Sequence, residues 1–94
     1  MSDEVKTVHV RVVGRVQGVG FRAWVARTAE KLALTGWVRN LGDGTVEAVF
    51  SGPVAVVDDM VARCHHGPRS AEVAEVKVSL ADGTYSSFEV RPTA

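Results

Sequence analysis

The sequence predicts an α+β fold in which two helices cover one face of a mostly antiparallel β-sheet. Apolar and polar side chains alternate over residues 8–12, which is typical of a strand with one face in a core. The apolar spacing then changes to three and four residues over 21–32, which indicates an amphipathic helix. An Asp-Gly pair at 43–44 lies between two strand-like runs and indicates a hairpin.

The first helix is predicted to begin at Phe21. Its apolar face comprises Phe21, Trp24, Val25, Thr28, Ala29 and Leu32. Glycine is common just after a helix because it accepts the left-handed conformation, so we expect Gly36 to cap the C-terminus. We also expect Trp24 and Trp37 to be core residues, with Trp37 beneath the turn that precedes the helix.

The hairpin strands are predicted over 36–40 and 45–50. Pro53 is suited to a first helical position, and helical spacing continues from there until Gly67-Pro68 ends the second helix. Cys64 continues the apolar stripe of this helix and is interpreted as a small core residue. His65 and His66 are adjacent, so they do not share a helix face, and we expect both to be exposed.

The last part of the chain predicts a fourth strand over 73–80 and a short fifth strand over 88–90, ended by Pro92. The order is therefore βαββαβ with one extra strand. Two helices cannot bury both faces of such a sheet, so they are expected to pack on one face, as in the ferredoxin-like split βαβ sandwich.

Length and composition predict one domain spanning residues 1–94. Eleven basic and eleven acidic side chains cancel, so no global field favours nucleic acid or an anionic membrane as a partner. The one cysteine excludes an internal disulfide, the N-terminus is acidic, and no apolar run reaches the ~18 residues of a membrane span. We expect a cytoplasmic monomer.

Residues 13–22 are the most informative stretch, because they join the first strand to the first helix through a turn with three glycines and end in Arg22. Glycine allows successive backbone N–H groups to point at one small anion, and the helix N-terminus adds a positive end. The arginine supplies a planar fork that matches two phosphate oxygens. A cation in a first helical turn is unfavourable by itself, so an anion between Arg22 and the backbone donors would explain its place.

Other interpretations of these motifs are weaker. Residues 18–23 match the dinucleotide pattern G-x-G-x-x-G/A, but a hairpin follows where a second parallel βαβ unit is needed. Residues 64–69 resemble a cysteine phosphatase loop with one residue too few. An RNA-recognition module would share the element order but needs an aromatic strand signature that is missing. A non-catalytic module that binds phosphoanions or a protein partner through the same loop remains the alternative to an enzyme.

The chain resembles the acylphosphatase family over nearly its whole length. The resemblance is carried by Val16-Gln17-Gly18-Val19-Gly20-Phe21-Arg22, by Gly36-Trp37-Val38-Arg39-Asn40, by Gly44-Thr45-Val46 and by Phe88-Glu89-Val90. It implies a ferredoxin-like fold and hydrolysis of acyl phosphates to carboxylate and inorganic phosphate. It departs at Leu41, where some members have a hydroxyl residue. An acylphosphatase-like domain of a larger carbamoyl-transfer protein is a related possibility, which the short chain disfavours.

By this resemblance, Arg22 would grip the phosphoryl group and Asn40 would orient the attacking water. The substrate-binding loop would comprise Gln17, Gly18, Val19, Gly20 and Phe21. We expect no cofactor and no metal, since the loop offers no carboxylate pair spaced for magnesium. Inorganic phosphate is expected to be both product and inhibitor. Arg15 is interpreted as an exposed arginine at the edge of the loop.

Overall fold

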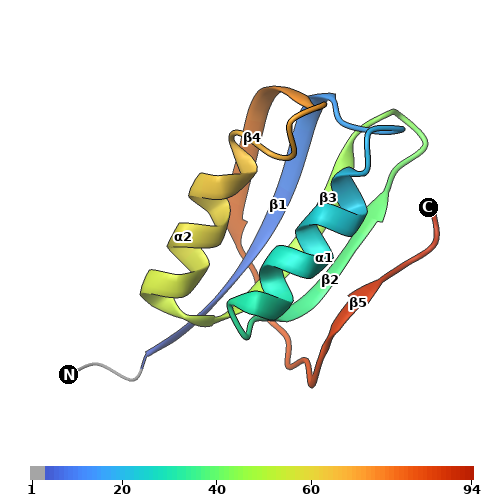
Figure 1. Ribbon diagram of the computed structural model, residues 1–94. Helices are drawn as coiled ribbons and strands as arrows, with labels where there is room; N and C mark the ends of the chain where they lie inside the picture. Colours follow the sequence, from blue (N-terminus) through green and yellow to red (C-terminus); the bar gives the residue numbers. More distant parts are fainter. Residues whose placement is uncertain (1–3) are drawn as a thin grey trace.

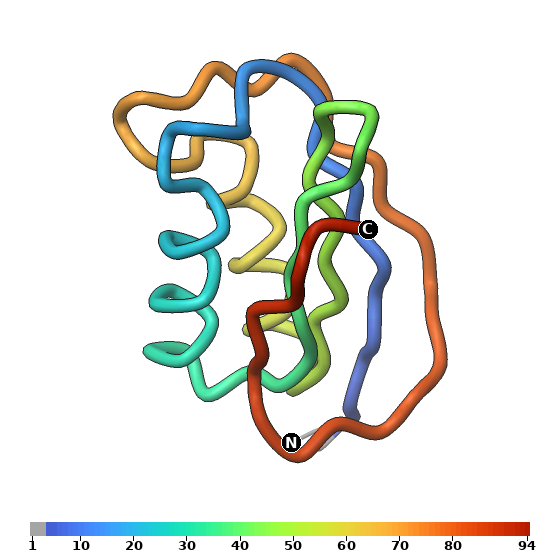
Figure 2. Tube along the Cα trace, turned by 90° about the vertical axis from the view of Figure 1, so that its right-hand side faces the viewer, coloured from blue at the N-terminus to red at the C-terminus, as the bar shows by residue number. Residues whose placement is uncertain are grey.

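The computed structural model describes residues 4–94. It contains five strands and two helices in one layered sandwich, with α1 and α2 on the same face of the sheet (Figure 1). The elements are β1 (Val5–Arg15), α1 (Phe21–Lys31), β2 (Thr35–Asn40), β3 (Val46–Pro53), α2 (Val54–Cys64), β4 (Glu72–Leu80) and β5 (Phe88–Val90). The turned view in Figure 2 separates the helical layer from the sheet, whose other face has no helix over it. The predicted ferredoxin-like sandwich is confirmed.

The strand order across the sheet is β4-β1-β3-β2-β5. β3 pairs antiparallel with both β1 and β2, and β4 pairs antiparallel with β1. The fifth strand is the exception, because it lies parallel to β2 at the edge of the sheet. Since β1 and β2 both run opposite to β3, they run parallel to each other and end at the same end of the sandwich.

The core lies between the sheet and the two helices. The valines at 8, 10 and 12 of β1 are at most 1% exposed, which confirms the alternation predicted for the first strand. Phe21 and Val25 of α1 and Met60 of α2 cover them from the other layer. Cys64 is buried at the end of α2, and burial raises the pKa of its thiol to about 12.

The prediction that Gly36 caps the first helix is wrong. Helix α1 ends at Lys31, and Ala33 takes the left-handed position at φ +57°. The N–H groups of Ala33 and Leu34 donate to Glu30 O and Ala29 O, which is the Schellman pattern of hydrogen bonds. The cap thus forms without glycine.

Gly36 lies instead in β2, at φ +135°, where a Cβ would stand 1.9 Å from Val49 O. Its role is to let two strands approach closely. Gly14 is likewise not part of the turn before α1, because it lies within β1 at an irregularity in the pairing with β4.

Trp37 is buried as predicted but does not lie beneath the turn. It lies beside Val38 in β2, and since Val38 belongs to the core, Trp37 points to the opposite face of the sheet. The guanidinium carbons of Arg39 and Arg91 lie 4.9 and 4.6 Å from its ring centroid. Two arginines therefore cover the ring in place of a helix.

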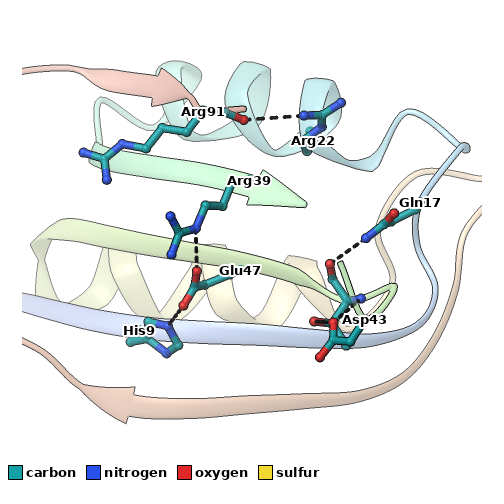
Figure 3. A network of polar contacts seen from close by, with 8 residues as sticks. His9, Gln17, Arg22, Arg39, Asp43, Glu47 and Arg91 are labelled. Atoms are coloured by element: carbon teal, nitrogen blue, oxygen red, sulfur yellow. Dashed lines mark hydrogen bonds and ion pairs between the residues drawn. The ribbon is translucent and has the colours of Figure 1, made fainter. Parts of the chain in front are cut away.

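On the same open face, hydrogen bonds join three polar side chains from three strands. Glu47 of β3 accepts a hydrogen bond from Arg39 at 2.7 Å and lies 2.6 Å from His9 Nε2 on β1 (Figure 3). Burial raises the pKa of Glu47, but the hydrogen bonds from His9 and Arg39 outweigh it and hold the pKa below its ordinary value. Glu47 therefore ties β1, β3 and β2 together as a carboxylate.

We expect Ala33→Gly to raise the free energy of unfolding by about 0.5–1 kcal/mol, because it removes the left-handed strain at a modest cost in unfolded-state entropy. Guanidinium denaturation measures the change. Gly36→Ala is the matched control and should destabilise strongly, since its Cβ meets a strand carbonyl. An unchanged or lower midpoint for Ala33→Gly would contradict this account of the cap.

The Glu47→Gln variant should be less stable than the wild-type chain by about 1.5–3 kcal/mol at pH 7, the range for hydrogen bonds to charged groups. The pKa of this carboxyl is lower in the folded state, so its contribution is present above the unfolded pKa and is lost as pH falls through the folded pKa. The difference between the two proteins should therefore shrink at pH 3. Urea denaturation at both pH values tests this, and a difference independent of pH would refute it.

Candidate active site

The candidate site lies where β1 and β2 both end. The loop after β1 leads into α1, and the hairpin after β2 lies at the same end of the sandwich (Figures 1 and 2). A pocket of about 200 Å³ opens between this loop and the end of β2. Its walls include Val16, Gln17, Gly18, Gly20, Phe21, Arg22, Ala23 and Asn40. Arg22, near the start of α1, and Asn40, at the end of β2, thus face one pocket.

Two glycines, Gly18 and Gly20, line this pocket with their backbone. Gly18 and Gly20 have φ of +75° and +79°, in the left-handed region that glycine adopts readily. A Cβ at either position would meet nothing within 4 Å, so space for a ligand lies beside the backbone. Gly20 is also the N-cap of α1, and it leaves the end of the helix without a side chain over it.

The first turn of α1 offers backbone donors to the pocket. The hydrogen bonding of the helix begins with Trp24 N–H, which donates to Gly20 O at 3.0 Å. The N–H groups of Phe21, Arg22 and Ala23 therefore have no acceptor within the helix. No acidic residue occupies this first turn, so the positive end of the helix dipole is uncompensated there. This arrangement suits an anion.

Arg22 adds a formal positive charge. Its side chain is partly buried, and Nη1 donates a long hydrogen bond of 3.5 Å to the carbonyl of Arg91 (Figure 3). Arg91 follows β5, and its own N–H donates to Val38 O at 2.8 Å. The segment after β5 therefore holds one edge of the guanidinium and leaves the other N–H groups for a ligand.

Asn40 is the last residue of β2, and its backbone is fixed on both sides. It pairs with Val46 of β3, and its carbonyl accepts a hydrogen bond from Ala94 N–H at 3.0 Å. Within residues 4–94 its side-chain amide has no hydrogen-bond partner. The amide is thus held at the pocket wall with both its donor and acceptor atoms available.

The remaining loop residues divide between backbone and side-chain roles. The side chains of Val19 and Phe21 pack against the core, so only their backbone can face an anion. Gln17 reaches across to the hairpin, where its Nε2 donates to Leu41 O at 2.8 Å and to Thr45 O at 2.9 Å. Sequence reasoning missed this contact, since nothing local to Gln17 indicates its partners. Arg15 is exposed, 3.8 Å from Glu72, as predicted.

A second, larger hollow of about 300 Å³ lies on the open face of the sheet, lined by His9, Arg11, Lys77, Val78 and Ser79. Its walls come from two adjacent strands, whereas the pocket beside Arg22 combines a helix N-terminus, a glycine loop and a guanidinium. The smaller pocket therefore has the chemistry of an anion site. Among residues 4–94, no three His, Cys, Asp or Glu side chains gather as a metal site would need.

The fold and this pocket together define a small ferredoxin-like α+β sandwich with a candidate anion site at one end. Residues 8–90 match the Acylphosphatase family, and the chain belongs to it. The acylphosphatase of Trichormus variabilis is 61% identical over 85 residues, which cover 89% of this chain and 84% of the relative. That of Rhodospirillum rubrum is 52% identical over 90 residues, covering 95% and 99% of the two chains.

A solved structure of an acylphosphatase from Coxiella burnetii superposes with a TM-score of 0.89 at 41% identity and covers 93% of each chain. The function of this chain is accordingly that of an acylphosphatase, a hydrolase that acts on small-molecule acyl phosphates. The comparisons give no support to the alternative of a non-catalytic binding module. Neither helix within residues 4–94 is long and apolar enough to cross a membrane.

Proposed function

We propose that the pocket between the glycine loop and Asn40 is the catalytic site, in which Arg22 and the loop N–H groups of residues 17–21 bind the phosphoryl group. The observation that carries the proposal is the convergence of Arg22, the N-terminus of α1 and Asn40 on one pocket of about 200 Å³. The guanidinium and the backbone donors match the charge and the several oxygens of a phosphoryl group.

The chemistry needs few groups. Water attacks phosphorus while the bond from phosphorus to the acyl oxygen breaks, and the electron pair leaves with the carboxylate. A carboxylic acid has a pKa near ~4, so this leaving group departs at neutral pH without a proton from the enzyme. The enzyme has to hold the phosphoryl group, stabilise charge on its equatorial oxygens and place the water in line.

Asn40 is proposed to place the water. Its amide carbonyl can accept one water proton, but a neutral amide is too weak a base to remove that proton. The proton therefore passes to a phosphate oxygen as the new bond forms, and the products are carboxylate and inorganic phosphate. Because its partner is water, Asn40 acts on the rate of the step more than on phosphate binding.

This mechanism uses no metal and no cofactor, so we propose activity in the presence of chelator. Inorganic phosphate should compete with substrate for the same loop. We further propose a monomeric enzyme of one domain over residues 1–94, since a chain of this length fits one domain built around one core. A reducing, cytoplasmic compartment is supported by the buried free thiol of Cys64.

Arg22→Ala should lower kcat/KM by about 100- to 1000-fold, because the developing phosphoryl charge loses a preorganised cation. Lysine at this position should rescue only part of the loss, since an ammonium cannot form two parallel hydrogen bonds. Hydrolysis of benzoyl phosphate in EDTA is the assay, and competition by inorganic phosphate should weaken in parallel. Circular dichroism controls for folding. A folded Arg22→Ala variant with wild-type kinetics would exclude the proposed role.

Asn40→Ala should reduce kcat for benzoyl phosphate by about 100-fold while leaving the inhibition constant for inorganic phosphate nearly unchanged. The same EDTA assay, run with and without added phosphate, separates the two effects. Equal losses in turnover and in phosphate binding would assign Asn40 to the phosphate instead of the water. Absence of turnover in the wild-type protein would reject the catalytic proposal as a whole.

A further inference from the structure

The two halves of the proposed site are joined by one side chain. Gln17 lies in the loop after β1, and its amide nitrogen points at the hairpin that follows Asn40 (Figure 3). Both amide hydrogens are used there, one on Leu41 O at 2.8 Å and one on Thr45 O at 2.9 Å. The side chain therefore has no donor left for a phosphate oxygen, and its remaining carbonyl would repel an anion.

The acceptors are the two carbonyls that close the hairpin. Leu41 O also accepts from Gly44 N–H at 3.1 Å, and Thr45 O also accepts from Leu41 N–H at 2.9 Å. Each carbonyl thus receives one bond from the hairpin and one from Gln17, which uses both of its lone pairs. The amide of Gln17 fits this pair of acceptors as a two-pronged donor.

The turn of the hairpin is held by hydrogen bonds of its own, which do not involve Gln17. Asp43 accepts hydrogen bonds from Thr45 Oγ1 at 2.6 Å and from Thr45 N–H at 3.0 Å, and these bonds lower the pKa of the Asp43 carboxyl. The contact from Gln17 therefore does not form the turn. It fixes where an already formed turn lies relative to the loop that precedes α1.

Asn40 depends on that placement because it directly precedes Leu41. Its side chain has no hydrogen-bond partner within residues 4–94, so its position follows from the backbone alone. Across the pocket, the loop that carries Gln17 also carries the proposed phosphate donors. A shift of the hairpin away from this loop would change the separation between Asn40 and the phosphoryl group.

We propose that Gln17 is a positioning residue, whose amide fixes the position of Asn40 relative to the phosphate-binding loop. The inference rests on the proposed function and deepens it, since it assigns the alignment of water with the phosphoryl group to a side chain that touches neither. Misplacement of a reacting group by about 1 Å can cost about 100-fold in rate. Loss of this contact should therefore appear in kcat and leave phosphate binding largely intact.

The test is a double-mutant cycle of Gln17→Met and Asn40→Ala, with benzoyl phosphate as substrate. Methionine keeps the length of the side chain and removes both donors. Gln17→Met alone should lower kcat by about 10- to 100-fold, with the inhibition constant for inorganic phosphate nearly unchanged. In the Asn40→Ala background, Gln17→Met should lower kcat by less than about twofold, which is within the error of such comparisons. A purely structural role would not produce this dependence on Asn40.

Asp59→Ala is the matched control, because it removes an exposed hydrogen-bonded pair with Arg63 on α2, away from the pocket. It should keep wild-type kcat. Equal losses from Gln17→Met in both backgrounds, or wild-type kcat in Gln17→Met, would overturn the positioning role while leaving the proposed function in place. A wild-type protein without turnover would instead overturn the proposed function, and this inference with it.

Gln17→Glu gives a second test if Gln17→Met does not fold. The introduced carboxylate cannot donate and faces two carbonyls, so kcat should fall at neutral pH. On protonation it regains one O–H donor, so kcat relative to the wild-type protein should rise as pH falls toward the carboxyl pKa of about 4. A ratio that does not change with pH would count against the contact as the cause.

Discussion

The antiparallel pairing of β3 with both β1 and β2 is the constraint on which the site depends. It makes β1 and β2 parallel, so the loop after one and the hairpin after the other emerge at the same end of the sheet. The parallel pairing of β5 with β2 brings the segment that follows Val90 to that end as well. The loop after β1 and the end of β2 therefore line one pocket, and the segment after β5 holds Arg22 from outside its walls.

The proposed anion site is local, in a chain that is neutral overall. Its positive character comes from the N-terminus of α1 and from Arg22, which lies in the first helical turn against the usual charge preference. Arg91 connects this region with the opposite face of the sheet, because its carbonyl accepts from Arg22 while its side chain covers Trp37. The proposed phosphate site would account for the place of Arg22, which helix stability alone does not.

Most of the fold could be predicted because its signals are local. The period-two valines of β1, the helical spacing after Phe21 and the Asp-Gly turn each depend on a few neighbouring residues. The wrong predictions concern residue types that suit two different structural roles. Gly36 suits a helix cap, but close approach to Val49 requires it in β2, and Ala33 makes the cap in its place. Burial of Trp37 was predicted correctly, but its ring is covered by two arginines from different segments, which the sequence did not indicate.

The sequence by itself determined the elements, their order and the residue types of the proposed anion site, because helix period, strand alternation and glycine content are properties of the chain. It also suggested Arg22 and Asn40 through their motifs. Only the tertiary structure decided that these side chains share a pocket and that the amide of Gln17 spans from one half to the other. The reason is physical: a hydrogen bond between distant segments has no local pattern, and it exists only once the sheet has brought those segments together.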